Sequence, residues 1–342
     1  MFRRRLVALI AAIPLVLVTF VAAPAGAQFP GTNGGIAFVR RSGSGADGYD
    51  STLRIVGPAD KRRTVAAGFE TIHDLSWTAT GRRLAFDGER GGRSGVWVVR
   101  ADARGLRRIL VRGASPSWAP NEGKLAVMTE RSHDDESPIS QIFIVTLDGE
   151  RTQITEGSPH FDPAWSPDGG WIAFRTRVEI DGATVGAIGT MRTDGTDRKL
   201  LAFGSLGSPD WSPDGRRILF TRRKTTAVID DGKHDCRSER FTVESVLATD
   251  GSDRVVHYVA TWPSADGNPY AGGYADARWS PDGQRIVVVE QRHLFSDAAC
   301  GGDDDEDTIV TFRADGSDYR YLLNERPEED LHEPAWRPIP VP

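Results

Sequence analysis

The feature that most constrains this chain is a five-residue motif, Trp-Ser-Pro-Asp-Gly, that occurs three times. The copies occupy residues 165–169, 211–215 and 279–283, and each is followed by a short apolar segment of the Ile-Ala-Phe type. Looser copies begin at Trp77 and Trp118. Proline presets φ at the second position of a turn, and glycine accepts backbone angles that strain other residues. Each copy therefore predicts a tight turn between two strands.

The rest of each repeat is predicted to form three further strands. In the repeat that begins at Trp165, residues 171–176, 185–192 and 198–202 are strand candidates, and residues 194–195 supply an Asp-Gly turn. Outside the N-terminal segment, no stretch shows a sustained helical period of apolar residues. Four antiparallel strands form one blade of a propeller. Repeats at intervals of roughly forty to seventy residues therefore predict an array of blades.

Five blades begin at motif tryptophans, and the two ends of the chain supply a sixth. The five blades begin at Trp77, Trp118, Trp165, Trp211 and Trp279. Residues 332–338 contain a Trp-Arg-Pro segment and residues 35–67 open with Gly-Ile-Ala-Phe, so that joining them restores one more copy. Such a closure leaves no free sheet edge. The sequence thus predicts an all-β fold, a six-bladed β-propeller of four-stranded antiparallel blades, closed by the C-terminal strand joining the N-terminal blade.

The first 27 residues have the pattern of a secretory signal peptide. Residues 3–5 are arginines, a long apolar stretch follows, and residues 25–27 are Ala-Gly-Ala, a small-x-small cleavage site. We expect cleavage before Gln28, which leaves a single propeller domain over residues 28–342. The protein is then exported, to the periplasm, the cell envelope or the medium. Because the apolar stretch is long, an uncleaved segment that contacts the membrane is the alternative.

The charge balance argues against a nucleic-acid partner. The chain has 42 Lys and Arg against 48 Asp and Glu, a net charge of −6. When the three arginines of the signal segment leave, 39 basic residues remain against the same 48 acidic ones, a net charge of −9. No basic tract survives in the mature chain. An acidic protein of this kind is expected to bind partners with basic groups.

The two cysteines fall in equivalent parts of neighbouring blades. Cys236 lies in residues 224–239 and Cys300 in residues 293–306, and both segments are expected to be long loops between second and third strands. Two such cysteines are expected to lie close and to form a disulfide in an exported protein. The acidic run at residues 303–307 lacks the regular oxygen spacing of a calcium loop, which favours a solvated loop over a calcium site.

The repeats resemble the TolB-type β-propeller repeat, whose signature is Trp-Ser-Pro-Asp-Gly followed by Ile-Ala-Phe. The matching copies cover nearly all of residues 31–338. The resemblance implies a platform on which other envelope proteins dock. We expect the chain to lack the separate N-terminal domain of TolB. We also expect it to lack the hydrolase domain that accompanies such repeats in prolyl oligopeptidase-type enzymes.

Acidic and imidazole side chains recur near one position of the repeat. Three residues before the tryptophans stand Asp74, Ser115, Asp162, Ser208, Asp276 and Glu333. Because the innermost strands of a propeller begin at one mouth of its channel, these side chains are expected to converge there. The predicted ligand-binding or partner-binding residues at this mouth are His73, Asp74, His160, Asp162, Asp276, His332 and Glu333.

Two interpretations of this group stay open. Carboxylates and imidazoles are common metal ligands, so His160, Asp162, His332 and Glu333 are candidates to bind a cation such as calcium. Alternatively, an acidic residue at the start of a strand bonds local backbone groups, and the histidines are partly buried polar residues. The second interpretation is the commoner one for such residues.

The chain contains no nucleophile elbow, phosphate-binding loop or cysteine-based zinc motif. We therefore predict a non-enzymatic, monomeric propeller that binds a protein or peptide, and we expect no cofactor. One alternative is a metal-dependent lyase or hydrolase with its site at the channel mouth. A weaker alternative is a module that binds cell-wall carbohydrate, with Tyr270 and Tyr274 as its aromatic platform.

Overall fold

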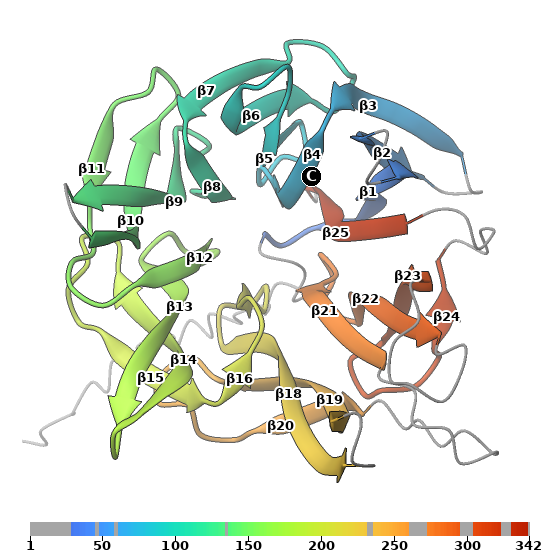
Figure 1. The fold of residues 1–342 in the computed structure, drawn as a ribbon. Coiled ribbons are helices and arrows are strands. Elements are labelled where there is room, and N and C mark those ends of the chain that lie inside the picture. The colour runs from blue at the N-terminus through green and yellow to red at the C-terminus, as the bar shows by residue number, and fades with distance from the viewer. Residues whose placement is uncertain are drawn as a thin grey trace, which may run out of the picture.

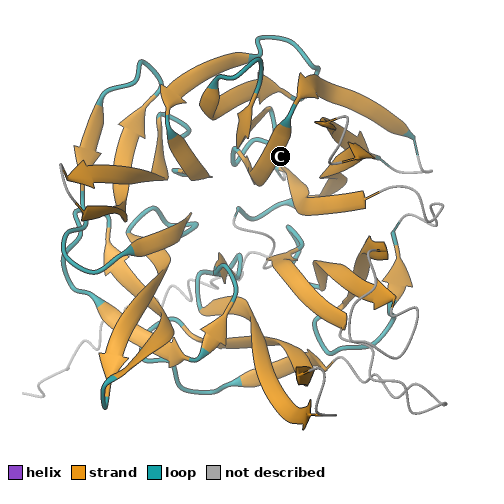
Figure 2. Ribbon diagram, viewed as in Figure 1, coloured by secondary structure: helices purple, strands orange, loops and turns teal. Residues whose placement is uncertain are grey.

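The computed structural model describes residues 29–44, 48–57, 61–133, 136–230, 235–259, 272–294, 304–322 and 330–340. Strands and the turns between them make up these ranges, and no helix occurs in them (Figure 2). A search of the same ranges for helices of membrane-spanning length and apolarity finds none. The predicted signal peptide, residues 1–27, and the cleavage site before Gln28 lie outside the described residues.

The described residues form six sheets that stand around a central channel (Figure 1). Within every sheet the paired strands run antiparallel. The innermost strand of each blade carries the motif tryptophan at or near its end, and the later strands follow outward. The predicted all-β, six-bladed propeller is confirmed.

Five blades are continuous in sequence, with their strands in order from the channel outward. One contains β4 (Thr71–Trp77), β5 (Arg83–Glu89), β6 (Ser94–Arg100) and β7 (Arg107–Val111). The next contains β8 (Gly113–Trp118), β9 (Lys124–His133), β10 (Glu136–Thr146) and β11 (Arg151–Gln153). The third contains β12 (His160–Trp165), β13 (Trp171–Ile180), β14 (Ala183–Arg192) and β15 (Lys199–Phe203). In the fourth, the inner strand is broken into β16 (Ser205–Leu206) and β17 (Asp210–Trp211), followed by β18 (Arg217–Asp230), β19 (Asp235–Leu247) and β20 (Val255–Val259). The fifth contains β21 (Gly272–Trp279), β22 (Arg285–Leu294), β23 (Asp304–Arg313) and β24 (Arg320–Tyr321).

The sixth blade joins the two ends of the chain. Its strands are β25 (Asp330–Ile339), β1 (Thr32–Ser44), β2 (Gly48–Val56) and β3 (Arg62–Phe69). β25 is innermost and pairs antiparallel with β1, in a register that places Ile36 opposite Trp336. The predicted closure, in which residues 332–338 join residues 35–67, is confirmed. Every blade is therefore flanked by two others, and the ring has no open end.

In two segments that were expected to be loops, the described residues are strands. The ladder between β18 and β19 extends to Asp230, well inside residues 224–239. Residues 293–306 likewise contain the end of β22 and the start of β23, with Leu294 paired to Asp304. For these paired residues the loop expectation, which rested on the polar composition of the segments, was wrong. Backbone hydrogen bonds sustain an antiparallel ladder whether or not its side chains are apolar.

The predicted disulfide lies outside the described residues. Cys236 belongs to β19 and its backbone pairs with Ile229, but its side chain is not described, and neither is any part of Cys300. The bond between them therefore stays a prediction. Of the acidic run, Asp307 is in β23, where its carboxylate lies 3.0 Å from His332 Nδ1 on β25.

The repeated motif forms a tight turn at the end of each inner strand. In the β12–β13 turn, the Gly169 N–H donates a hydrogen bond of 3.0 Å to the Ser166 carbonyl. Gly169 has φ 77°, a region that favours glycine. Asp168 accepts hydrogen bonds from Ser166 Oγ at 2.6 Å and from Gly170 N at 2.9 Å. The polar residues of the motif thus fix a local turn.

Apolar residues after the turn pack with the motif tryptophan between adjacent blades. Trp165 is 2% exposed and belongs to one cluster with Ile172 and Phe174 of its own blade. The same cluster contains Ala119 and Ile142 of the preceding blade. Burial of a large aromatic side chain across the blade boundary therefore ties neighbouring blades together.

In five of the six blades, the residue before the tryptophan forms a hydrogen bond to the tryptophan of the next blade. Where it is serine or aspartate, its side chain accepts a hydrogen bond from the backbone N–H of the next tryptophan. These contacts are Ser76 Oγ with Trp118 N (3.2 Å), Ser117 Oγ with Trp165 N (2.8 Å) and Asp210 Oδ2 with Trp279 N (2.8 Å). Where it is alanine, the next tryptophan donates its indole N–H to the alanine carbonyl. These contacts are Trp211 Nε1 with Ala164 O (2.9 Å) and Trp77 Nε1 with Ala335 O (3.2 Å).

These two patterns of hydrogen bonding predict that two tryptophans of similar burial differ in their hydrogen-bond contribution to stability. Trp211→Phe removes the bond to the Ala164 carbonyl, whereas Trp118 Nε1 has no hydrogen-bond partner within the described part of the chain. We expect Trp211→Phe to lower the free energy of unfolding by about 1 kcal/mol more than Trp118→Phe does. Denaturant unfolding of both variants measures the difference. Equal losses would show that the indole hydrogen bond contributes nothing to joining the blades.

Candidate functional site

The residues three positions before the tryptophans share an unusual backbone conformation. Five of them lie in the left-handed region: Asp74 (φ 47°), Ser115 (φ 48°), Asp162 (φ 49°), Asp276 (φ 52°) and Glu333 (φ 54°). Each coincides with a break in the register between the inner strand and its neighbour, which marks a β-bulge. At the sixth position, Ser208, the inner strand is interrupted between β16 and β17. The bulge therefore recurs in five inner strands and changes the direction in which the side chain at this position points.

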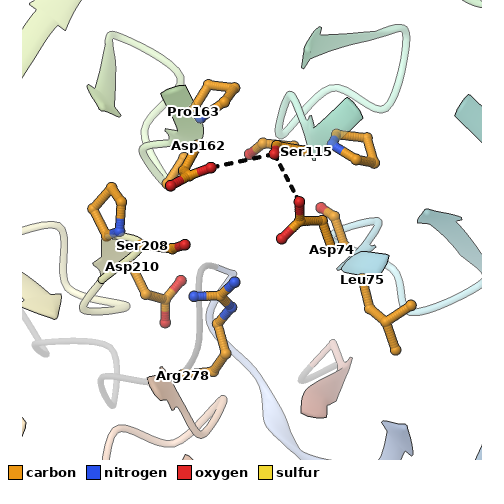
Figure 3. Close-up of a pocket in the computed structure, with 13 residues that line it drawn as sticks. Asp74, Leu75, Ser115, Asp162, Pro163, Ser208, Asp210 and Arg278 are labelled. Carbon is orange, nitrogen blue, oxygen red and sulfur yellow. Dashed lines mark hydrogen bonds between the residues drawn. The ribbon is translucent and has the colours of Figure 1, made fainter. Parts of the chain in front are cut away.

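Side chains from five consecutive blades meet in a small cavity at the channel mouth (Figure 3). The cavity has a volume of about 40 Å³, and its polar lining includes Asp74, Ser76, Ser115, Ser117, Asp162, Ser208, Asp210 and Arg278. Ser115 Oγ lies 2.7 Å from Asp74 Oδ2 and 3.3 Å from Asp162 Oδ1. A hydroxyl has one proton, so Ser115 donates to one carboxylate at a time.

Contacts between blades extend this acidic group to the closing strand. The Asp74 N–H donates a hydrogen bond of 3.0 Å to Glu333 Oε2, and the Ser115 N–H donates one of 3.1 Å to Asp87 Oδ1. His73 Nδ1 lies 3.9 Å from Glu333 Oε1. The Glu333 carboxylate raises the pKa of His73, although burial opposes that shift, and the negative charge of Asp87 adds to it.

Burial and mutual repulsion raise the pKa values of several of these carboxyl groups. Burial, followed by the charges of Asp87 and Asp162, raises the pKa of Asp74 to about 7. Burial is also the largest cause for Asp276, whose pKa is raised to about 7 with a contribution from Glu333. The pKa of Asp87 is raised to about 7, mainly by burial. The channel mouth therefore concentrates more negative charge than its own cations neutralise.

Two functional candidates were missed because they precede the tryptophan by one residue. Arg278 and Asp210 line the acidic cavity and also a second cavity of about 40 Å³, which is lined by Phe29, Trp77 and Trp336 among others. In Figure 3 the Arg278 guanidinium points toward the middle of the channel beside Asp210. Burial alone would lower the pKa of Arg278, but Asp210 and Asp276 raise it. Arg278 and Asp210 thus separate the two cavities.

Asp87 and Arg175, on the second strands, were also missed. Arg175 Nε lies 2.7 Å from Asp162 Oδ2 and so neutralises part of the mouth. A signal for both was present in the sequence: each is a charged residue three positions after the first apolar residue of a motif strand. The pairing of Asp87 with His73 and of Arg175 with Phe161 brings that position to the mouth.

Two of the residues that were predicted as metal ligands, His160 and His332, have other neighbours in the structure. His160 is 4% exposed, lies 5.2 Å from the Phe174 ring between centroids, and has a pKa lowered to about 4, mainly by burial. His332 contacts Asp307 on the adjacent blade. Among the described residues, no group of three or more His, Cys, Asp or Glu side chains is arranged to hold a metal ion. Tyr270 and the side chain of Tyr274 lie outside the described residues.

Comparison with known proteins supports the fold. No protein-family model matches the chain, and no curated protein matches its sequence. TolB from Acinetobacter baumannii is similar with a TM-score of 0.61 at 18% identity, covering 89% of this chain and 67% of that one. A putative TolB from Agrobacterium tumefaciens has a TM-score of 0.52 at 18% identity, covering 90% and 99%. The fold is a TolB-like six-bladed propeller.

The same fold occurs in a protein of different activity. Hydrazine synthase from Kuenenia stuttgartiensis has a TM-score of 0.62 at 15% identity, covering 92% of this chain and 48% of that one. This chain therefore spans about half of the hydrazine synthase chain. A shared fold at such identities does not carry function with it, so function has to be argued from the site.

The raised pKa values predict that the acidic mouth destabilises the fold at alkaline pH. A carboxyl group whose pKa is higher in the folded than in the unfolded chain favours folding least once pH exceeds both values. For Asp276 this cost grows between about pH 4 and pH 7. We expect Asp276→Asn to raise the free energy of unfolding at pH 8, because it removes a buried charge that neighbouring carboxylates repel. The gain should be about 1–2 kcal/mol, since water at the mouth screens part of the repulsion.

At pH 4 the same substitution is expected to have little effect, since the carboxyl group is then protonated in the folded state and only about half ionised in the unfolded chain, so that little of the cost remains. Denaturant unfolding at the two pH values measures the contrast. An equal effect at both would show that Asp276 is not under electrostatic strain.

Proposed function

We propose that this chain is an exported, non-enzymatic propeller that binds a protein or peptide partner by accepting a cationic group at the acidic channel mouth. The observation that carries the proposal is the excess of carboxylates there. The described carboxylates at and around the mouth are Asp74, Asp87, Asp162, Asp210, Asp276 and Glu333. The described cations are Arg175 and Arg278, with His73 beside them. A bound ammonium or guanidinium group would relieve the repulsion.

The size of the cavity supports a side chain as the bound group. A volume of about 40 Å³ exceeds what one water molecule needs and suits the head group of a lysine. Asp74 and Asp162 lie on either side of Ser115, so an ammonium group there has acceptors from three blades. Charge-assisted hydrogen bonds of this kind are stronger than neutral ones.

The rest of the chain supports a location outside the cytoplasm. The first 27 residues carry the pattern of a secretory signal, and the fold is TolB-like. We therefore place the partner in the cell envelope or outside the cell. The propeller would present its channel mouth as a firm surface, because most of the described residues of the mouth belong to paired strands.

A pull-down from the native cell envelope tests the proposal. The bait is the propeller, cross-linked to whatever it binds, and the test variant is Asp74→Asn with Asp276→Asn. Asparagine resembles the protonated carboxyl group, so the fold should tolerate both changes. The matched control is Asp102→Asn with Asp197→Asn, which makes the same charge change at exposed sites away from the channel.

We expect a partner that is captured by the wild type and by the control pair, and that is lost with the channel pair. A partner retained equally by all three proteins would move the interface away from the channel mouth. Metal analysis and substrate screens of the wild type would follow if no specific protein were captured, and turnover in such a screen would contradict a purely binding role.

The raised pKa values give the cation site a pH dependence of known sign. Asp74, Asp87 and Asp276 have pKa values of about 7, so they ionise between about pH 6 and pH 8. His73, whose pKa is also raised, loses its positive charge as pH rises. Both changes favour a cation, so we expect affinity for a lysine-containing partner to increase from pH 6 to pH 8. Calorimetric titration across this range tests the expectation, and the Asp74→Asn/Asp276→Asn variant should show a weaker pH dependence because only Asp87 and His73 still titrate there.

A further inference from the structure

A third cavity, larger than the two cavities at the channel, lies between two blades near the channel mouth. Its volume is about 500 Å³, within the range of ligand-binding pockets. One wall is formed by Phe161, Arg175 and Arg177 of β12 and β13, and the rest by residues of β14 and of the segment that includes β16. It is therefore a cleft between the third and fourth blades, and we call it the blade cleft.

The blade cleft gathers positive charge around one aromatic ring. The guanidinium carbons of Arg175 and Arg177 lie 5.2 Å and 5.5 Å from the centroid of Phe161. Arg175 is paired with Asp162. Within the described ranges Arg177 has no carboxylate at ion-pair distance, and the nearby Glu179 accepts a hydrogen bond from Thr184 Oγ1 at 2.5 Å. The cation–π contact with Phe161 holds the Arg177 guanidinium at the cleft wall, and no described carboxylate forms an ion pair with it there.

Glycines leave backbone on the opposite wall of the cleft. The Gly204 N–H donates a hydrogen bond of 2.8 Å to the Gly186 carbonyl, and both residues line the cleft. A Cβ atom on Gly186 would lie 2.5 Å from the Gly204 carbonyl oxygen, and one on Gly204 would lie 2.8 Å from Arg222 Nη1. A side chain is therefore not accommodated at either position without displacing these neighbours, and both positions require glycine.

An equivalent cleft in another blade shows that the fold does not dictate these charges. Asp87 pairs with His73 as Arg175 pairs with Phe161, each partner standing four residues before its tryptophan. Two residues further along, Glu89 stands where Arg177 does, and Asp87 and Glu89 line a cavity of about 410 Å³. The same two positions accept two acids in one blade and two arginines in the other.

We infer that the blade cleft binds a carboxylate group of a peptide or protein, with Arg177 as its principal ligand and Arg175 beside it. Guanidinium groups bind carboxylates through paired, charge-assisted hydrogen bonds. The inference goes beyond the proposed function and does not depend on it, since it concerns another cavity and the opposite charge. Because Arg175 contacts Asp162 as well as Phe161, the cleft adjoins the acidic mouth. A partner with a basic group and an acidic group side by side would fit both.

Small probes and matched variants test the inference without knowledge of the partner. Three compounds are titrated into isotope-labelled protein while the arginine side-chain N–H resonances are followed. N-acetyl-Gly-Gly offers a C-terminal carboxylate, N-acetyl-Glu-amide offers a side-chain carboxylate, and N-acetyl-Gln-amide is neutral. The test variant is Arg177→Gln, and the control is Arg216→Gln, which removes an equally positive and exposed side chain elsewhere.

We expect at least one carboxylate probe to shift the Arg177 resonance saturably, and the neutral probe to leave it unchanged. Binding should weaken about tenfold in Arg177→Gln and stay within about twofold in Arg216→Gln. Which of the two carboxylates binds distinguishes a C-terminus from an acidic side chain. Equal weakening in both variants, equal shifts with the neutral probe, or no saturable shift with either carboxylate would overturn the inference. Thr184→Trp, which fills the exposed rim of the cleft, should abolish binding with an unchanged melting temperature.

Discussion

The antiparallel pairing of β25 with β1 is the interaction on which the rest of the structure depends. It joins the two ends of the chain and turns an array of blades into a ring. The candidate site exists only in that ring. Glu333 on the closing strand accepts a hydrogen bond from the backbone of Asp74 in the next blade, and His332 contacts Asp307 in the blade before it. Closure therefore positions part of the mouth and removes the exposed sheet edges at once.

Strain and charge are concentrated at the same place. Non-glycine residues with positive φ lie within the inner strands of five blades, and burial raises the pKa values of two of them, Asp74 and Asp276. Such features cost folding free energy and persist where the surrounding structure holds them. Here the hydrogen bonds and tryptophan packing between blades supply that support, as at Ser117 with Trp165. A cationic ligand at the mouth would recover part of the cost.

The repeats separate what the fold requires from what one blade adds. Each complete motif keeps the same tryptophan and the same turn, whose residues are used locally, as Ser166 and Asp168 show. The positions that face the channel or the clefts vary in charge from blade to blade. Asp87 and Arg175 are equivalent in the fold and opposite in charge. Binding chemistry can thus be changed at these positions while the scaffold stays the same.

The sequence by itself determined the turns, the strand count of each blade, the number of blades and the closure. These follow from local residue chemistry and from a repeat that is visible without any contact information. It also identified the position of Asp74 and Asp276, because that position has a fixed distance from each tryptophan. Only the tertiary structure brought in Arg278, Asp210, Asp87 and Arg175, buried His160 against Phe174, and extended the hairpin of β18 and β19. The reason is physical: a side chain's neighbours at the channel come from other blades, and bulges and strand twist set their directions.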